Sequence, residues 1–169
     1  IKRTCDMKRF LILFILAISV LGTSAQSVEG LIRQYRHEKH ADYVHIPRLV
    51  MSMARLFVKE DTEDAKVVKA VSSIRVLDLE DCPAAVRENF RKTLRTFRPA
   101  GYTPVIFNKE ADATSRIYIR EKKGYVRELL ILSADNTDGA IVQIKGKIRP
   151  EDVDRVAEQN TKKGKRGKK

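Results

Sequence analysis

The 169-residue chain has no tryptophan, only two cysteines and three histidines, and each shortage limits its chemistry. Cys5 lies in a segment that we expect to be removed, so Cys82 alone remains and no intramolecular disulfide can form. The sequence contains no Gly-x-Ser-x-Gly elbow, no phosphate-binding loop and no dinucleotide fingerprint. We therefore assign no catalytic residue and no cofactor.

The three histidines, His37, His40 and His45, cluster beside Glu38 and Asp42, which raises the question of a metal site. The two histidines of "HEKH" are three positions apart, whereas zinc-protease chemistry needs four with a glutamate between them. A polar helix end followed by a loop explains the same residues. We favour that explanation and expect no metal site.

The N-terminal region has the layout of a secretory signal. Lys8 and Arg9 precede an apolar run over residues 10–20, which ends in small residues up to Ala25. The run is too short for a permanent membrane helix, so we expect no transmembrane span after cleavage behind Ala25. The signal predicts an exported protein of the periplasm or cell envelope.

Three parts of the chain follow from this interpretation. Residues 1–25 form the signal peptide, and residues 1–6 are expected to lie upstream of the true start, since Met7 with two following basic residues begins such a signal better. Residues 26–160 are expected to form one α+β domain. Residues 161–169 are expected to be a basic, disordered tail.

Helices and strands are predicted from the spacing of apolar residues. Helical spacing or caps occur in five segments, which begin at Ser27, Pro47, Thr62, Pro83 and Pro150. The segment from Ser27 is expected to fray near His40, and the one from Pro83 to end at Gly101. Strands are predicted at residues 73–81, 102–108, 115–121, 126–133 and 140–148.

The last four strands are joined by short connections, so they are expected to form an antiparallel meander. A helix separates the strand at Ile74 from the strand at Tyr102, and these two could run parallel in one mixed sheet. The predicted fold is a two-layer α+β sandwich. Its mostly antiparallel sheet has about five strands in the order β-α-β-β-β-β-α, with the N-terminal helices packed on one face.

One sheet face is expected to meet solvent. Arg116, Tyr118 and Arg120 alternate with Ile117 and Ile119, so the two sets point to opposite faces. We assign the arginine and tyrosine set to the solvent-exposed face.

Several segments resemble a known family, domain of unknown function 4252, made of small exported proteins from Bacteroidetes. The similar features are the signal ending in Ser-Ala-Gln, "HIPRLVMSMARLF", "SIRVLDLED" and "RIYIREKKGYVRELLIL". The resemblance covers most of the chain after the signal and implies the same compartment and fold. It transfers no catalytic or binding residue.

Positive charge is concentrated at the C-terminus. The chain carries 34 basic and 22 acidic residues. Six of the basic residues stand among the last eight positions: Lys162, Lys163, Lys165, Arg166, Lys168 and Lys169. Without the tail and the expected signal peptide, 24 basic and 21 acidic residues remain, so the domain is nearly balanced and no physiological nucleic acid is expected. The tail can instead touch glycans or lipid phosphates.

A second basic feature is an arginine ridge on the predicted helix after Pro83. Its members recur at helical spacing: Arg87, Arg91, Arg95 and Arg98. Arginine binds carboxylate and phosphate with two parallel hydrogen bonds, so the ridge can dock an acidic partner or lipid headgroups. The alternative is an ordinary solvated helix face, with Glu88 paired to Lys92.

These features predict an exported, non-enzymatic binding or accessory domain of the cell envelope. Its partner would be an acidic protein or an anionic envelope component, held by the ridge or the tail. One alternative is a hydrolase that uses scattered carboxylates such as Asp78 and Glu80. Another is anionic-polymer binding through the tail alone. Cys82 is either a buried apolar side chain or, before Pro83 at a helix start, a thiol with a lowered pKa.

Overall fold

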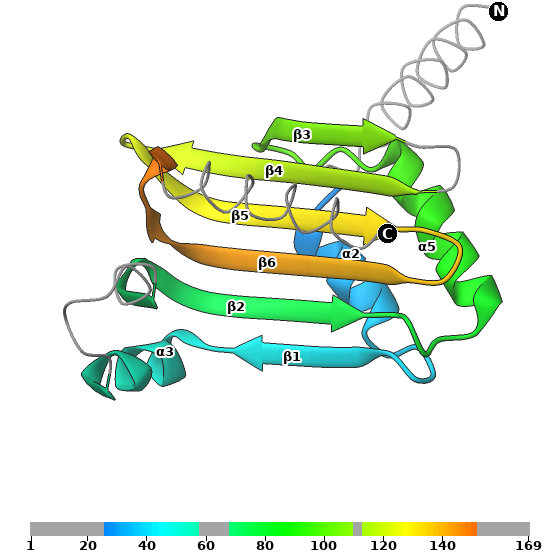
Figure 1. The fold of residues 1–169 in the computed structure, drawn as a ribbon, viewed down its shortest axis with the longest axis horizontal. Helices are drawn as coiled ribbons and strands as arrows, with labels where there is room; N and C mark the ends of the chain where they lie inside the picture. Colours follow the sequence, from blue (N-terminus) through cyan, green and yellow to red (C-terminus); the bar gives the residue numbers. More distant parts are fainter. Residues whose placement is uncertain (1–25, 58–67, 110–112, 152–169) are drawn as a thin grey trace, which may run out of the picture.

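The computed structural model describes residues 26–57, 68–109 and 113–151 of the chain (Figure 1). Its elements, in chain order, are α2 (Val28–Tyr35), β1 (Asp42–Ile46), α3 (Arg48–Ala54), the 3-10 helix η2 (Arg55–Phe57), β2 (Val71–Asp78), α5 (Ala84–Thr96), β3 (Thr103–Lys109), β4 (Thr114–Lys122), β5 (Tyr125–Ala134) and β6 (Gly139–Ile148). The expected signal peptide, the start of the helix at Thr62 and the basic tail lie outside the described residues. The described chain has an α+β fold.

The sheet has six strands in the order β1-β2-β6-β5-β4-β3, and every neighbouring pair is antiparallel. The predicted meander from β3 to β6 is confirmed. The strands at Ile74 and Tyr102 are not neighbours in a mixed sheet, because the chain after α5 starts the meander at the far edge. The meander then returns across the sheet until β6 pairs with β2 (Figure 1).

The prediction of about five strands was wrong by one strand, β1, in a segment that we expected to be a loop. β1 lies at a sheet edge and pairs with β2 from Asp42 opposite Asp78 to Ile46 opposite Ile74. Most of its side chains are solvent-exposed, so its apolar alternation is weak. An edge strand of this kind is specified by the partner strand more than by its own residues.

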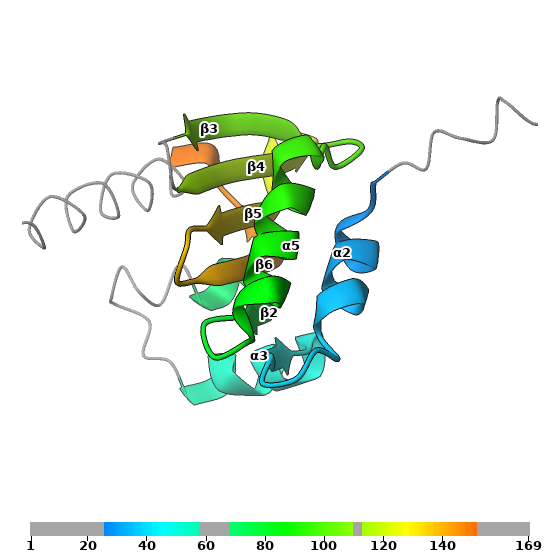
Figure 2. The same cartoon turned by 90° about the vertical axis from the view of Figure 1, so that its right-hand side faces the viewer.

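Helices α2 and α5 lie side by side on one face of the sheet (Figure 2). The side chain of Ser27 accepts a hydrogen bond from the Gly30 amide at 2.9 Å and caps α2, as its sequence predicts. The rings of Tyr35 and Phe90 meet edge to face at 5.0 Å. The Tyr35 hydroxyl also bonds to Thr93 at 2.9 Å, so the two helices form one layer.

The solvent-exposed assignment was wrong for Arg116 and Tyr118, which are 2% and 4% exposed beneath the end of α5. Arg116 donates to the carbonyls of Phe97 and Arg95, both at 3.2 Å, and the Tyr118 hydroxyl donates to Phe97 at 3.4 Å. The last carbonyls of a helix have no partner within the helix. Burying these donors is therefore favourable, because they satisfy those carbonyls.

The opposite sheet face is apolar as well. It carries a second buried cluster, formed by Met51, Val71, Val126, Leu129 and Ile148. Partly buried isoleucines extend this cluster across the sheet, among them Ile117 and Ile119. Alternation therefore separated the two faces of β4 correctly, but both faces are apolar.

Two turns set the ends of the meander. Lys123 and Gly124 have positive φ of 56° and 73° and form the predicted tight hairpin between β4 and β5. At the other end, Asp135 Oδ1 accepts hydrogen bonds from the amides of Thr137 and Asp138, both at 2.7 Å. This aspartate closes its own turn, as the sequence predicts for a loop of this composition.

Candidate functional site

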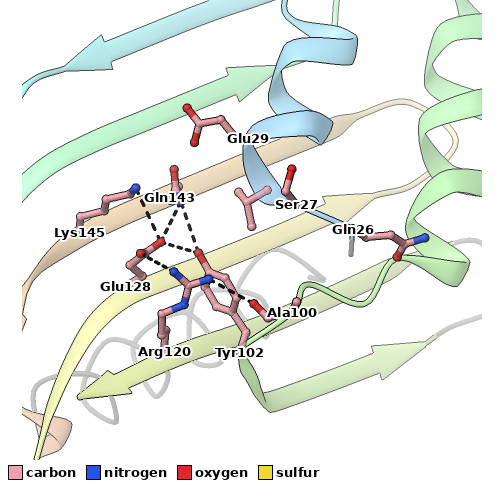
Figure 3. A pocket seen from close by; sticks show the side chains of 10 residues that line it. Gln26, Ser27, Glu29, Ala100, Tyr102, Arg120, Glu128, Gln143 and Lys145 are labelled. Atoms are coloured by element: carbon pink, nitrogen blue, oxygen red, sulfur yellow. Dashed lines mark hydrogen bonds and ion pairs between the residues drawn. The ribbon is translucent and has the colours of Figure 1, made fainter. Parts of the chain in front are cut away.

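A polar pocket of about 300 Å³ opens between the first turn of α2 and the middle of the sheet. Figure 3 shows its side chains converging from separate segments: Arg120 from β4, Glu128 from β5, and Gln143 and Lys145 from β6. Tyr102 enters from the loop before β3. The pocket thus exists only once the meander and α2 are in place.

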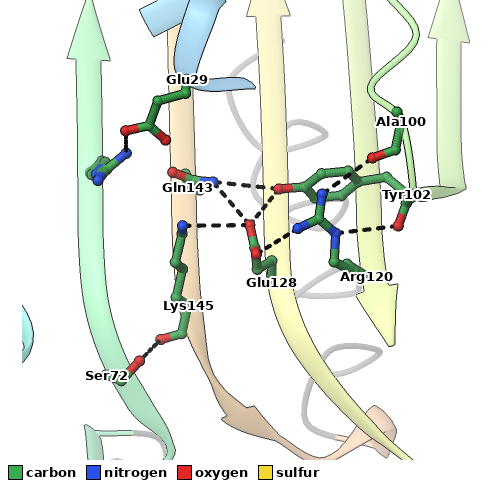
Figure 4. A network of polar contacts seen from close by, with 10 residues as sticks. Glu29, Ser72, Ala100, Tyr102, Arg120, Glu128, Gln143 and Lys145 are labelled. Carbon is green, nitrogen blue, oxygen red and sulfur yellow. Dashed lines mark hydrogen bonds and ion pairs between the residues drawn. The ribbon is translucent and has the colours of Figure 1, made fainter. Parts of the chain in front are cut away.

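Glu128 is the centre of the hydrogen-bond network in this pocket (Figure 4). Its Oε2 accepts from the Tyr102 hydroxyl at 2.5 Å and from Gln143 Nε2 at 3.0 Å, and lies 3.8 Å from the Lys145 ammonium. Its Oε1 accepts from Arg120 at 2.9 Å. Both carboxylate oxygens are occupied, so Glu128 is not a free general base.

Arg120 extends the network to the loop that follows α5. It donates to the carbonyls of Ala100 and Gly101 at 3.2 and 3.3 Å. Its guanidinium also lies 4.2 Å from the centre of the Tyr102 ring. These contacts fix the loop, the tyrosine and the carboxylate relative to each other.

The titration of Tyr102 reflects these surroundings. Burial, together with the hydrogen bond that the phenol donates to Glu128, raises the pKa of Tyr102 to about 12. The phenol therefore stays protonated at physiological pH. Gln143 is 2% exposed, and its Oε1 has no hydrogen-bond partner among the described residues. The side chains of the pocket therefore hold one another in place through hydrogen bonds and leave one acceptor, Gln143 Oε1, without a partner among the described residues. This arrangement is not that of an acid–base centre.

A second pocket, which we call the hairpin pocket, lies at the β4–β5 turn. It has a volume of about 400 Å³ and is lined by Lys122, Lys123, Tyr125, Arg127 and Lys147. The Lys147 ammonium lies 4.3 Å from the centre of the Tyr125 ring. Within the described part of the chain, none of the four cations forms an ion pair. An unneutralised group of this kind attracts anions.

Comparison with known proteins identifies the family. A family model described as Domain of unknown function (DUF4252) matches residues 35–156, well over half of the chain. The chain belongs to the DUF4252 family. The match confirms the predicted resemblance and includes all six strands and the hairpin pocket. No curated protein and no solved structure matches the chain.

In this DUF4252 chain, two of the four residues of the predicted arginine ridge, Arg87 and Arg91, make contacts within the fold. Arg87 donates to the carbonyls of Glu80, at 2.9 Å, and Cys82. Arg91 forms an ion pair with Glu88 at 2.5 Å and donates to Asn136 at 3.0 Å. These guanidinium groups brace α5 against neighbouring loops, which reduces what they can offer a partner.

The other two ridge residues differ. Arg95 is exposed on α5, and Arg98 lies beyond the end of the helix and donates to the Phe97 carbonyl at 2.8 Å. The predicted binding residues of the tail, 162–169, lie outside the described residues. Of the predicted set, Arg95 alone is described and has a side chain without a hydrogen bond or ion pair inside the described fold.

The carboxylates proposed for hydrolysis have a structural use. Asp78 Oδ1 accepts a hydrogen bond from the Glu80 amide at 2.8 Å, which closes the turn after β2. The Glu80 side chain is exposed. Cys82 is 2% exposed, and burial raises the pKa of its thiol instead of lowering it. The buried apolar interpretation of Cys82 therefore fits the DUF4252 fold better than a reactive thiol.

The histidines of the DUF4252 chain are spread over three local structures. Arg36 donates to His37 at 2.9 Å after α2, His40 has a positive φ of 66° in the following turn, and His45 is exposed on β1. Residues 26–57, 68–109 and 113–151 contain no group of three or more potential metal ligands. In the same ranges, no helix has the length and apolarity needed to cross a bilayer.

Sequence reasoning missed both pockets. In "EKKGYVR", residues 121–127, it found only the tight turn, although three cations stand within six positions of each other. This local concentration of positive charge was the sequence feature from which the hairpin pocket could have been predicted. Lys147 joins the pocket through the pairing of β6 with β5, and no local pattern predicts this contact.

Proposed function

We propose that the protein is an exported, non-enzymatic binding domain of the cell envelope and that its partner is anionic. The leader-like residues 1–25 support the location. The hairpin pocket supports the binding function. The described residues place its four cations around one tyrosine with no carboxylate in the lining.

The hairpin pocket carries this proposal better than the arginine ridge does. Arg87 and Arg91 make hydrogen bonds within the fold, whereas the side chains of Lys122, Lys123 and Arg127 are solvent-exposed and have no hydrogen-bond or ion-pair partner among the described residues. Desolvating an arginine that is already paired would cost its present contacts. An anion at the hairpin pocket gains charge-assisted hydrogen bonds without breaking any within the described fold.

The proposal that the domain is not an enzyme rests on the hydrogen bonds, burial and pKa values of its candidate catalytic groups. In the polar pocket, Glu128 accepts hydrogen bonds on both oxygens and Tyr102 has a pKa raised to about 12. Asp78 is committed to a turn and Cys82 is buried with a raised thiol pKa. None of these groups is a nucleophile or base poised for neutral pH.

Two experiments test the proposal. Inorganic pyrophosphate, titrated into the isotopically labelled protein, is expected to shift the backbone amide resonances of residues 122–127. The Lys123→Glu, Arg127→Glu double variant is expected to abolish these shifts. The Lys39→Glu variant changes an exposed charge in the turn after α2, outside the hairpin pocket, and is expected to keep them.

Unchanged hairpin resonances in saturating pyrophosphate would refute the binding site. The location is tested separately by cell fractionation with N-terminal sequencing. A processed protein that begins at Gln26 in the envelope or periplasmic fraction is expected, and an unprocessed cytosolic product would contradict export.

A further inference from the structure

Helix α3 and the 3-10 helix η2 present an unusual group of apolar side chains to solvent. Five of them are half exposed or more: Val50 at 50%, Met53 at 56%, Leu49 at 72%, Leu56 at 81% and Phe57 at 84%. Contiguous exposed apolar surface on a folded domain generally marks a contact with a protein or a membrane. We call these five residues the apolar wedge.

The apolar wedge is held in place from beneath. Met51 is 7% exposed and packs into the second buried cluster with Val71 and Ile148. Arg55 donates to the Val71 carbonyl at 2.6 Å and ties η2 to the first residue of β2. Since α3 already buries Met51 against the sheet, the wedge side chains are directed away from the core by a fixed backbone.

Helix α3, which carries most of the apolar wedge, and the β4–β5 turn, which carries the hairpin pocket, lie at the same end of the sheet (Figure 1). The strand register gives the same result. Ile46, where β1 leads into α3, is opposite Ile74 near the start of β2, and Val71 is opposite Gly146 near the end of β6. Ile148, in turn, is opposite Val126, next to the β4–β5 hairpin.

The charged side chains that the structure describes at this end are mostly cations, which suits an anionic surface. The hairpin segment 121–127 has three cations and one acidic residue, Glu121, and Lys147 adds a fourth cation from β6. Arg48, exposed in the first turn of α3, adds a cation beside the apolar wedge. Tyr125 lies among these cations, and an aromatic ring with a polar tip suits the headgroup level of a membrane.

We propose that this end of the sheet docks on an anionic lipid bilayer. The hairpin pocket binds lipid phosphates while the apolar wedge enters the boundary between headgroups and acyl chains. A bilayer presents phosphates and acyl chains over one continuous plane, so it satisfies both features together. Either feature alone would give weak binding, and stable peripheral attachment needs two such signals. This inference rests on the proposed anion-binding function.

Vesicle co-sedimentation tests the inference with the protein as recovered from expressing cells. The two probes are vesicles of phosphatidylcholine alone and of phosphatidylcholine mixed with phosphatidylglycerol. Binding is expected on the mixed vesicles and is expected to weaken with added salt. All variants keep the same N-terminal region and tail, so differences between them report the two surface features.

Two double variants separate the contributions. Neutralising two lysines near an anionic surface lowers affinity by about 30-fold, so Lys122→Glu with Lys123→Glu is expected to lower it by at least that factor. Leu56→Asp with Phe57→Asp is expected to lower vesicle affinity by about ten-fold or more while leaving pyrophosphate binding intact. Both wedge side chains are more than 80% exposed, so these substitutions spare the core. Lys39→Glu changes the net charge by two units, as Leu56→Asp with Phe57→Asp does, and is the charge-matched control for that pair.

Three outcomes overturn the inference. If pyrophosphate binds at residues 122–127 but vesicles do not, the partner is a soluble anion or an acidic protein, and the proposed function stands without the membrane. If charge reversal in the tail abolishes vesicle binding while both double variants bind normally, the tail is the lipid contact. If neither pyrophosphate nor vesicles depend on the hairpin, the inference and the proposed anion site both fail.

Discussion

Removal of one hydroxyl group tests the polar pocket directly. In the Tyr102→Phe variant the ring can still stack under Arg120, but the hydrogen bond to Glu128 Oε2 is lost. A hydrogen bond to a charged group contributes about 1.5–3 kcal/mol to the free energy of unfolding. Gln143 and Lys145 still contact the same oxygen, so we expect a loss of about 2 kcal/mol at neutral pH.

The same variant has a signature at high pH that a general packing defect would not show. The pKa of Tyr102 is raised from 10.0 to about 12, so between these values the unfolded chain releases a proton that the folded protein retains. The stabilisation associated with the neutral phenol is therefore fully present below pH 10 and is lost as the pH rises through 12. Tyr102→Phe is expected to remove this part of the alkaline loss of stability.

Urea unfolding followed by circular dichroism, at neutral pH and at steps above pH 10, measures both effects. Ultraviolet absorbance of the folded protein is expected to show the Tyr102 phenol titrating near pH 12, about two pH units above the ordinary tyrosine value of 10.0. Tyr43→Phe is the control, because the Tyr43 ring lies against Arg36 while no hydrogen bond of its hydroxyl is present in the described fold. Equal stability of the Tyr102 variant and the parent, or a Tyr102 that titrates normally, would refute the account of the pocket.

Three further substitutions or treatments probe other parts of the fold. Arg116→Met is expected to lower the free energy of unfolding by about 2 kcal/mol, because it removes two hydrogen bonds that a buried guanidinium donates to carbonyls at the end of α5; unchanged urea stability would contradict that role. Gly146→Ala is expected to lower the free energy of unfolding by about 2 kcal/mol or more, since the Cβ of the new alanine would collide with the Ala70 carbonyl oxygen. A variant as stable as the parent would show that this close approach is absent. Native Cys82 is expected to react with iodoacetamide far more slowly than in urea, and equal rates would mean that the thiol is not buried.

The sequence predicted the meander because its signals are local. The turns at Lys123–Gly124 and Asp135–Gly139 each contain the residues that their own backbone needs. The sequence did not predict β1, because Asp42–Ile46 is a strand only by virtue of its pairing with β2. Local turn chemistry can be read from a few residues, whereas an edge strand depends on a partner distant in sequence.

The candidate site was less predictable for a related reason. Alternation placed Arg116 and Tyr118 on one face, but their partners are carbonyls about twenty positions earlier at the end of α5. Helical spacing found the ridge residues, yet it could not show that Arg87 and Arg91 bond to neighbouring loops and side chains. Hydrogen-bond partners and pocket linings depend on strand order, which composition and periodicity do not specify.

The position of β6 between β2 and β5 has a consequence for how the chain matures. Among the described strands, the one synthesised last joins the two halves of the sheet, as the hydrogen bond from Ser72 to Lys145, 73 positions away, illustrates. Until β6 arrives, β2 and β5 each expose an unpaired strand edge, which is prone to aggregation. A truncation before Gly139 would therefore leave two separate sheet fragments with unpaired edges, β1 with β2 and β3 to β5, instead of a smaller domain.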